Sequence, residues 1–440
     1  MRALDGIRVF EIGIAIAAPG AGRALAFHGA EVIKVESQAS PDVVRLLGSA
    51  WLRDDEEHAA AWGDSSPYVP EMNADKKSIA LELKTPEGRD AAHRLVAECD
   101  VFLANFSAKA LVSLGLDYET VSRLRPDIVY IQLPGFGSDP TMPYYPFVAW
   151  GPNQAPLVGM DELTGYPDQE PAGIATIAPP DYLSAQHAVT AVLAGLAHRD
   201  ATGEGVHVDV SQFETTIGIL GPFVMHHALT GVSQSRIGNR SLWAAPEGVY
   251  PCRGHERWIA LSVESDEQWT ALVALSGGRL DDARWSTSEG RHEHHDDLDD
   301  ALAQWTADHE NGDLAARLQA AGIAAHLVAT NEDVLQDEHI KQRGWYHITP
   351  SPRFTRELFH GHAIRMSATP GTFHRASPLF GEHTREVLAE VAGMDPADVD
   401  AMVTAGQAHD PPAPDMIIDR PYEQWLHVLF PGVTDTRDLT

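Results

Sequence analysis

The chain has 440 residues, of which 44% are hydrophobic and 22% are charged. This length exceeds one ordinary hydrophobic core, so we expect a soluble globular protein of two domains. The 63 acidic residues outnumber the 32 basic ones and give a formal net charge of −31. Such a surface argues against nucleic acid and anionic membranes as partners. Adaptation to salt, or solubility alone, would also account for it.

The sequence gives no sign of export or membrane insertion. No window approaches the run of about 18 apolar residues that spans a bilayer, and the first residues lack the basic and apolar regions of a signal peptide. The two cysteines, Cys99 and Cys252, are too few for a disulfide framework. We therefore expect a cytoplasmic protein.

The first part of the chain alternates predicted strands with helical patterns. We expect strands at residues 7–12, 31–36, 78–83, 101–105 and 127–133, with helices at 17–28 and 87–99 among them. This alternation predicts an α/β fold with a parallel, doubly wound sheet whose ligands bind at the carboxyl ends of the strands.

The later part of the chain is less regular. A strand is expected at residues 206–210 and an apolar helix near 213–229, followed by a polar stretch rich in glycine and proline. A second α+β unit is expected at about 258–328. A loop-rich segment and a closing helical region at 385–404 then precede a tail that contains several prolines.

Two local motifs resemble a dinucleotide-binding site and a zinc site, but each lacks part of the required pattern. The strand, turn and helix before Glu36 resemble a dinucleotide site, which would make the protein an NAD-dependent dehydrogenase. Its glycines do not follow the G-x-G-x-x-G pattern, however. The histidine-rich run at 291–297 lacks the helical spacing of a zinc site, so we expect no metal.

Asp181 ends an apolar run, residues 173–181, and directly precedes a long alanine-rich helical pattern. The simplest interpretation of an aspartate in this position is a helix N-cap. A carboxylate that is oriented and partly desolvated can also attack a thioester. The local pattern alone leaves both interpretations open.

Short segments in a consistent order from about residue 4 to residue 407 carry a chain-wide resemblance. They include LDGIRV at 4–9, GAEVIKVE at 29–36, NADKKSI at 73–79, KTPEG at 84–88, NF at 105–106, LGL at 114–116, GFG at 135–137, LTGYP at 163–167, Asp181, 199–205, RIGNR at 236–240, AGI at 321–323 and LFGEHT at 379–384. Together they resemble the class III CoA-transferases. Only the proline-bearing tail lies outside the match.

The resemblance implies an interlocked homodimer, in which each chain is threaded through a hole in the other. It also implies a Rossmann-like large domain and a small α/β domain. On this basis we assign residues 1–215 to the large CoA-binding domain, 216–250 to a linker, 251–332 to the small domain, 333–407 to a segment that returns to the large domain, and 408–440 to a C-terminal extension.

The matching position for the family nucleophile is Asp181. The resemblance implies that Asp181 attacks an acyl-CoA donor to form an anhydride, then an aspartyl-CoA thioester, and finally passes CoA to a carboxylic acid acceptor. CoA is thus expected as a substrate, with no tightly bound cofactor. Backbone N–H groups around Ala15, Ile16 and Ala17 are our candidates for stabilising the oxyanion.

Only some of the family's CoA-binding positions have matching residues in this chain. Lys76, in the stretch that begins at Asn73, matches a CoA-binding lysine, and Asn105 with Phe106 matches a segment that lies along the cofactor. Formyl-CoA transferase-like members have arginines where this chain has Ser37 and Ser113. We therefore consider Arg45 as a substitute for phosphate binding.

The alternatives to CoA transfer are a racemase, a thioester hydrolase and a catalytically silent subunit. Family racemases use a histidine and an aspartate as acid and base, but the histidine position here is Trp150. A thioester hydrolase stays open, because water could intercept the Asp181 intermediate. A silent subunit would have lost Asp181. The acyl group is undetermined, although Trp150 and Trp243 suggest room for more than a formyl group.

Overall fold

The computed structural model describes residues 1–45, 66, 68–173, 178–351 and 356–411. The chain divides into two compact units. Unit 1 comprises Met1–Val158, Ile174–Met225 and Asp337–Thr440, and unit 2 comprises Gly159–Gly173 and His226–Gln336. The sequence did not predict that Gly159–Gly173 belong to unit 2. The segment that returns to the large domain was predicted to begin at residue 333, and unit 1 resumes at Asp337.

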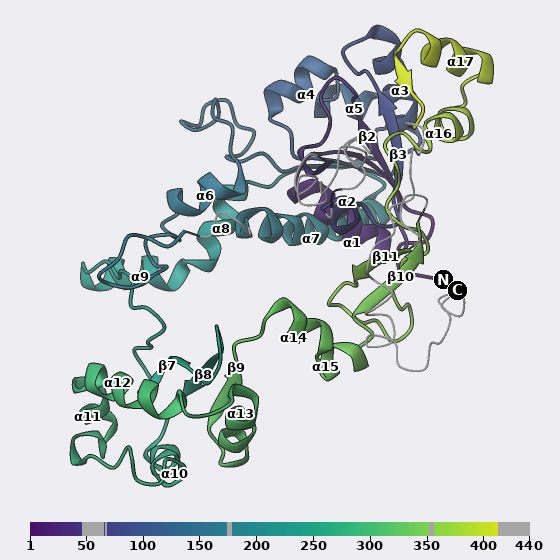
Figure 1. Cartoon of the computed structure of the whole chain (residues 1–440). Helices are drawn as coiled ribbons and strands as arrows, with labels where there is room; N and C mark the ends of the chain where they lie inside the picture. Colours follow the sequence, from purple (N-terminus) through teal and green to yellow (C-terminus); the bar gives the residue numbers. More distant parts are fainter. Residues whose placement is uncertain (46–65, 67, 174–177, 352–355, 412–440) are drawn as a thin grey trace. The chain divides into compact units, whose positions relative to one another are not determined.

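Unit 1 is built on a seven-stranded sheet with the strand order β12-β3-β2-β1-β4-β5-β6 (Figure 1). Its strands are β1 (Arg8–Ile12), β2 (Glu31–Glu36), β3 (Lys77–Leu81), β4 (Val101–Ala104), β5 (Val129–Gln132), β6 (Val206–Asp209) and β12 (Ala408–His409). All neighbouring strands are parallel except β12, which pairs antiparallel with β3. The order from β3 to β6 is that of a doubly wound nucleotide-binding sheet.

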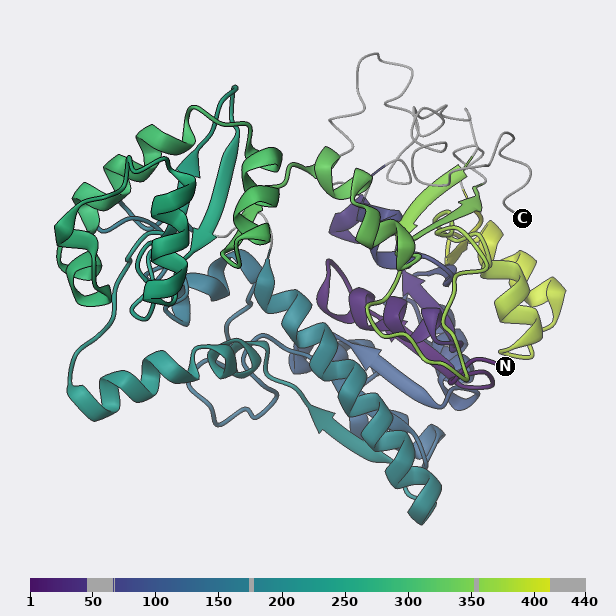
Figure 2. The ribbon, with the colours of Figure 1, turned by 90° about the horizontal axis from the view of Figure 1, so that it is seen from below.

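Helices cover both faces of this sheet because successive side chains along a strand point to opposite faces. Val9 and Val101 pack on one face against α1 (Ala17–Phe27) and α7 (Pro179–Thr202). Figure 2 shows these two helices lying over the same side of the strands. Phe10 and Phe102 belong to the core on the opposite face. The helices there are α3 (Pro86–Ala97), α4 (Ala108–Leu114), α5 (Tyr118–Leu124), α16 (Thr384–Glu390) and α17 (Pro396–Thr404).

The remaining elements of unit 1 surround this layered core. They are η1 (Val43–Arg45), α2 (Tyr68–Asn73), α6 (Gly151–Leu157), α8 (Gln212–Ile219), α15 (Glu338–Gln342), β10 (Tyr346–Pro350) and β11 (Arg356–His360). Strands β10 and β11 pair antiparallel. Phe27 of α1 packs with Phe359 and Phe373, which joins the returning chain to the first helix. Most of the expected C-terminal extension lies outside the described residues, and its first residues form β12.

Unit 2 has its own core, formed by an antiparallel sheet in the order β7-β8-β9. Its elements are β7 (Glu247–Pro251), β8 (Trp258–Ser262), β9 (Ala324–Leu327), α10 (Asp266–Leu275), η4 (Ala283–Trp285), α11 (Ser288–Glu293), α12 (His295–Thr306), α13 (Asn311–Ala320) and α14 (Asn331–Gln336). Trp269, Trp285 and Trp305 are buried among its helices. Helix α9 (Gly221–Thr230) spans the boundary between the units.

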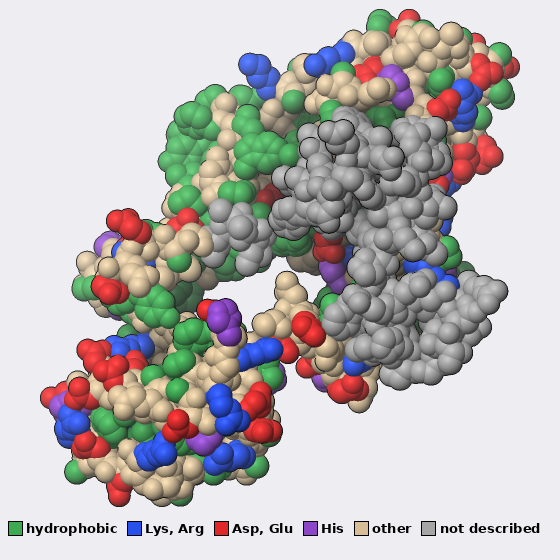
Figure 3. Space-filling model, viewed as in Figure 1, with side chains coloured by type: hydrophobic (Ala, Val, Ile, Leu, Met, Phe, Trp, Pro, Cys, Tyr) green, Lys and Arg blue, Asp and Glu red, His purple; other side chains and the backbone are tan. Residues whose placement is uncertain are grey.

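The described helices include none whose length and hydropathy would allow it to cross a membrane. Figure 3 shows acidic side chains distributed over the face in view, often beside basic ones on unit 2. In the part of the chain that the structure describes, no three potential ligands gather into a metal site. The histidine-rich run at 291–297 instead forms the end of α11 and the start of α12.

Candidate active site

The order of the strands reverses between β1 and β4, and ligands of doubly wound sheets bind in the crevice at this switch point. Asn105, which directly follows β4, holds the loop after β1. Its side chain accepts from the Ile14 amide at 3.0 Å and donates to the Ile14 carbonyl at 2.8 Å. Ala15 has a φ of 59°, and its amide donates to Asp42 at 2.8 Å. The loop is therefore fixed from both neighbouring strands.

A cavity of about 590 Å³ opens beside this loop, and we call it the Asp181 cavity. Its lining consists of Ile14, Ala15, residues 105–110, residues 134–137, residues 145–150, Asp181 and Gln212. The rim is apolar: the exposed fractions are 59% for Phe147, 72% for Val148 and 44% for Trp150. Figure 3 shows hydrophobic side chains gathered over this part of unit 1.

Asp181 lies in the first turn of α7, and its residue is only 7% exposed. Prolines at the first two positions, Pro179 and Pro180, favour the start of a helix because their missing N–H groups have no helical acceptor there. The Gly151 amide donates to the Asp181 carboxylate. Residues 174–177, in the apolar run before Asp181, lie outside the described residues.

Burial raises the pKa of Asp181 from 3.8 to about 6, and the hydrogen bond from Gly151 opposes this rise only in part. Asp181 is therefore mostly ionised at pH 7 but poorly solvated. A carboxylate in this state is more nucleophilic than one in bulk water.

The structure does not support the N-cap interpretation of Asp181. The N-cap position is Ala178, which has a left-handed conformation with φ 47° and ψ 55° and makes no side-chain capping bond. Asp181 stands three residues later and directs its carboxylate to Gly151 of α6. Its side chain thus joins two helices at the cavity rather than closing the end of its own helix.

A second cavity, of about 230 Å³, lies beside the first at the carboxyl ends of β2 and β3, and we call it the β2 cavity. Its lining consists of residues 12–14, 35–37, 39, 40, 42, 82–84, 106, 110, 113 and 114. Ile14, Phe106 and Ala110 line both cavities. Phe106 therefore stands at their junction, and its expected position along CoA stays a prediction.

Lys76 lies beneath α1 rather than at the wall of either cavity. Its ammonium is fully buried and contacts Glu11 at 2.7 Å, the Pro19 carbonyl at 2.8 Å and the Asn73 side chain at 3.2 Å. Burial lowers the pKa of Lys76 to about 8, although Glu11 acts to raise it. A phosphate could reach Lys76 or Asn73 only by displacing these contacts, so their role as CoA ligands stays a prediction.

Arg45 is likewise occupied. Its guanidinium donates to both carboxylate oxygens of Glu36, at 2.8 and 2.6 Å, and it lies over the Phe380 ring. Both charged groups are buried, and Arg45 with Lys34 lowers the pKa of Glu36 to about 2 against the effect of burial. The Glu36 carboxylate borders the β2 cavity, but the arginine is turned inward. Its role in phosphate binding stays a prediction.

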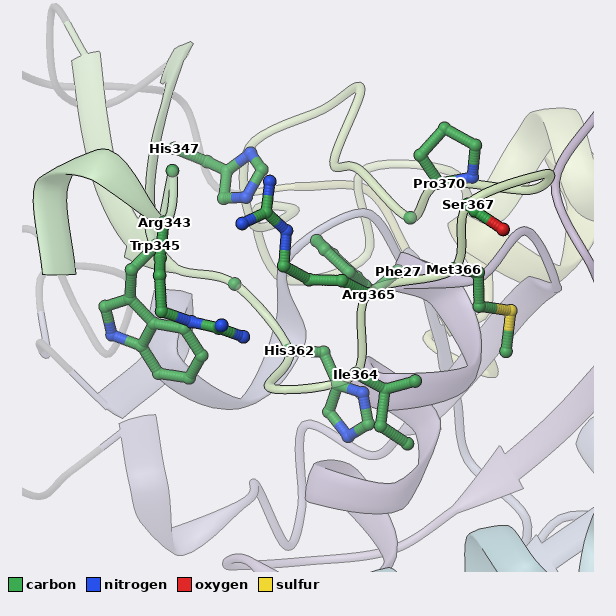
Figure 4. A pocket seen from close by; sticks show the side chains of 13 residues that line it. Phe27, Arg343, Trp345, His347, His362, Ile364, Arg365, Met366, Ser367 and Pro370 are labelled. Atoms are coloured by element: carbon green, nitrogen blue, oxygen red, sulfur yellow. The ribbon is translucent and has the colours of Figure 1, made fainter. Parts of the chain in front are cut away.

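A third cavity, of about 420 Å³, lies near β10 and the chain that follows β11. Figure 4 shows His347, His362, Arg343 and Arg365 around it. Its described lining contains no carboxylate. The carboxylate that the family resemblance implies as the nucleophile lies in the Asp181 cavity instead.

The comparisons with known proteins agree with this geometry. The family model described as CoA-transferase family III matches residues 4–384. The chain belongs to CoA-transferase family III.

Two relatives of this family III CoA-transferase match it over almost their whole length. A succinyl-CoA–D-citramalate CoA-transferase of Chloroflexus aurantiacus is 32% identical, with 92% of this chain and 97% of the relative covered. A succinate–glutarate CoA-transferase of Agrobacterium fabrum is also 32% identical, covering 88% and 95%. The crystal structure of a CaiB/BaiF family protein from Brucella suis superposes with a TM-score of 0.79 at 31% identity, covering 89% of this chain and 99% of that one.

The lining of the Asp181 cavity suits a transferase better than a racemase. Among its described residues, Asp181, Lys109 and Tyr145 carry titratable side chains and none is a histidine. Trp150, where family racemases have their histidine, lines the cavity. Trp243, the other aromatic residue expected near the acyl group, belongs to unit 2 and is exposed.

Three residues of the site were missed in the sequence. Gly151 approaches Asp181, Gln212 ties α8 to α6 through Gln154 at 3.1 Å, and Lys109 lines the cavity. Gly151 stands at the N-terminus of a short helix and Lys109 follows a serine N-cap. These local signals predict helix starts but do not show that the starts meet at one cavity.

Proposed function

We propose that this family III CoA-transferase moves CoA between two carboxylic acids through covalent intermediates on Asp181. The observation that carries the proposal is Asp181, the one carboxylate in the described lining of its cavity, which is buried at the switch point of the sheet and oriented by the Gly151 amide.

Four exchanges of acyl bonds would complete a cycle. An Asp181 carboxylate oxygen attacks the thioester carbonyl of the donor, which forms a mixed anhydride and releases CoA thiolate. The thiolate attacks the Asp181 carbonyl of the anhydride, which forms aspartyl-CoA and releases the donor acid. The acceptor carboxylate then attacks aspartyl-CoA, and the released thiolate attacks the acceptor carbonyl to give the new acyl-CoA and free Asp181. Each step exchanges one acyl bond for another, so ATP is not required.

The oxyanion formed at each step needs N–H donors near the reacting carbon. We assign this role to the backbone amides of Ile16 and Ala17, for which no acceptor is found among the described residues. The Ala15 amide, our third candidate, already donates to Asp42 and instead helps to hold the loop. Stabilisation of the oxyanion by a fixed loop avoids reorganisation during the reaction.

CoA would lie across Phe106, with its nucleotide toward the β2 cavity and its thioester in the Asp181 cavity. Phe106 lines both spaces, which supports this path. The adenosine end would then occupy the side of the sheet where doubly wound folds bind a ribose. The aromatic face of Phe106 would pack against the apolar pantetheine arm.

We infer that succinyl-CoA is the donor and a dicarboxylic acid is the acceptor. The relatives from Chloroflexus aurantiacus and Agrobacterium fabrum are named for succinyl-CoA or succinate and a second dicarboxylic acid. The apolar rim at Phe147, Val148 and Trp150 would shield the anhydride from water, which favours transfer over hydrolysis.

We further propose that the active species is the interlocked homodimer of the family. Helix α9 has apolar side chains but buries none of its residues: the exposed fractions are 55% for Val224, 56% for Met225 and 79% for Leu229. Such a helix requires a covering surface. Native mass spectrometry should give twice the chain mass at nanomolar concentration, and a monomer there would contradict the proposal.

The free cysteines accord with a cytoplasmic location.

The mechanism is tested by incubating the protein with succinyl-CoA and hydroxylamine, followed by peptide mass analysis. We expect a hydroxamate on Asp181, formed only when the donor is present. Transfer that proceeds without any modification of Asp181 would overturn the mechanism. Release of free CoA and succinate at the same rate with and without an acceptor acid would identify a hydrolase instead.

A further inference from the structure

The chain has six lysines, and four of them already have acidic partners. Lys34 and Lys76 are buried against Glu11, Lys77 contacts Glu31 and Glu386, and Lys341 contacts Glu338. The other two, Lys84 and Lys109, form no ion pair with any described residue. Both are exposed and each lines one of the two cavities that meet at Phe106.

Each of these lysines is the sole cationic side chain in the described lining of its cavity. Lys84 lines the β2 cavity and Lys109 lines the Asp181 cavity. In a chain with a net charge of −31, lysines without an ion pair to any described residue give the two adjacent cavities a local preference for anions.

Acidic groups in the lining of the β2 cavity do not compete for Lys84. Glu36 is held by Arg45 and Asp42 by Lys34 at 2.8 Å. Glu82 accepts hydrogen bonds from the Ser37 hydroxyl at 2.7 Å and from two backbone amides. With these carboxylates occupied, the Lys84 ammonium is available to a ligand.

Lys109 lies in the first turn of α4, next to the residue at the junction between the cavities. Ser107 caps the helix by accepting from the Ala110 amide at 3.2 Å. Ala110 lines both cavities and Ser113 lines the β2 cavity. Lys109 and Ser113 are four residues apart, so they lie on the same side of the helix. A ligand that spans both cavities therefore passes along this side of α4.

We propose that Lys84 binds the 3′-phosphate of CoA and that Lys109 binds its diphosphate. The inference rests on the proposed function, in which CoA spans the two cavities. CoA carries two anionic groups, with the 3′-phosphate on the ribose and the diphosphate between the ribose and pantetheine. The β2 cavity is on the ribose side of a doubly wound sheet, which assigns the 3′-phosphate to Lys84. Lys109, in the cavity of the reacting thioester, then faces the diphosphate.

This pair of lysines would take the role of the two arginines that formyl-CoA transferase-like members have at the positions of Ser37 and Ser113. Ser37 donates to Glu82, and Ser113 donates to the Ala110 carbonyl at 2.7 Å. Neither serine carries charge, and Arg45 is bound to Glu36. Phosphate recognition in this protein thus comes from lysines on the segment after β3 and on α4, which hold phosphates as point charges rather than as bidentate partners.

The test measures the affinity of the full-length protein for CoA and for 3′-dephospho-CoA by isothermal titration calorimetry. We expect wild type to prefer CoA by about tenfold, the size of one charge-assisted contact. Lys84→Ala should lose this preference, and Lys84→Arg should recover most of it. Lys109→Ala should bind both ligands about tenfold more weakly and keep the preference. Arg123→Ala removes an exposed charge that lines neither cavity, and it should match wild type.

Two outcomes would overturn the proposal. One is a Lys84→Ala variant that still distinguishes CoA from 3′-dephospho-CoA. The other is a Lys109→Ala variant with unchanged CoA affinity, whose rates fall only with dicarboxylic acids; Lys109 would then bind the distal carboxylate of the substrate. Binding is measured without turnover, so these results stand apart from the trapping of Asp181. If the lysine variants behave as predicted but transfer proceeds without any modification of Asp181, the covalent mechanism is refuted and the lysine assignment is left intact.

Discussion

Gly151 and Asp181 approach so closely that a side chain on Gly151 would collide with the carboxylate. A Cβ atom added to Gly151 would lie 2.0 Å from the Oδ2 atom of Asp181 and 2.7 Å from the Cβ atom of Ala178. The amide of the same glycine donates to Asp181. Helix α6 thus contributes both the space and the hydrogen bond that fix the proposed nucleophile.

The first prediction concerns this contact. Gly151→Ala should lower kcat by about 100-fold, because a displacement of the nucleophile by about 1 Å is enough for such a loss. Gly218→Ala is the matched control, since an added Cβ at Gly218 meets no atom within 4 Å. Steady-state kinetics of both variants, with circular dichroism to verify folding, make the comparison. Equal kcat values for Gly151→Ala and wild type would show that Asp181 does not act from this position.

The second prediction concerns stability. Burial raises the pKa of Asp181 to about 6, so the folded state binds a proton more tightly than the unfolded state. The ionised carboxylate therefore destabilises the fold increasingly as the pH rises from about 4 to 6, and fully above 6. At about 1.4 kcal/mol per pKa unit, the cost is about 3 kcal/mol. Asp181→Asn should abolish transfer yet raise Tm at pH 7.5.

The pH dependence of the increase in Tm shows whether the increase comes from the burial of the Asp181 carboxylate or from another effect of the substitution. Thermal unfolding of Asp181→Asn and wild type should converge near pH 4, where both side chains are neutral. A difference in Tm that is the same at pH 4 and pH 7.5 would contradict the assigned role of burial. Asp42→Asn is an unsuitable control because Asp42 is buried in an ion pair with Lys34. Asp90 should be changed instead, since it is exposed and its ion pair with Arg94 lies at the surface.

The third prediction is a pH profile for turnover. Because the carboxylate form of Asp181 is the nucleophile, kcat/KM for succinyl-CoA should fall about tenfold per pH unit below pH 6. The yield of Asp181 hydroxamate should follow the same curve, since both depend on the same ionisation. Rates should be measured where circular dichroism shows an unchanged fold. A profile that stays flat down to pH 5 would contradict the raised pKa.

Much of the sheet of unit 1 could be predicted from the sequence. Apolar runs such as Val101–Ala104 are bounded by turns and buried on both faces, so their strand identity is locally encoded. The pairing of Ala408 with Leu81 could not be predicted, because a two-residue strand at the end of the chain carries no periodic signal. The helix expected at 213–229 divides into α8 and α9 at Leu220.

The site was only partly predictable for a similar reason. Asp181 became the candidate nucleophile because the order of the family-like segments along the chain places it at the matching position. Its environment depends on contacts between distant segments, such as Gly151 with Asp181 and Asn105 with Ile14. The type of residue at position 76 could not reveal that its ammonium would point inward to Glu11, since a buried lysine and an exposed one have the same local sequence.

The fourth prediction separates structure from ligand binding at Lys76. Lys76→Met leaves buried Glu11 with Lys34, at 3.4 Å, as its only cationic partner among the described residues, and should destabilise the protein by about 3–5 kcal/mol even without CoA. Lys77→Met is the neighbouring control. Lys77 and its partner Glu31 are only partly buried and its other partner, Glu386, is exposed, so the loss of Lys77 should cost less than about 1 kcal/mol. Urea unfolding of both variants in the absence of ligand gives the comparison. A Lys76→Met variant as stable as wild type but with about tenfold weaker CoA binding would instead make Lys76 a CoA ligand, as the family resemblance implies.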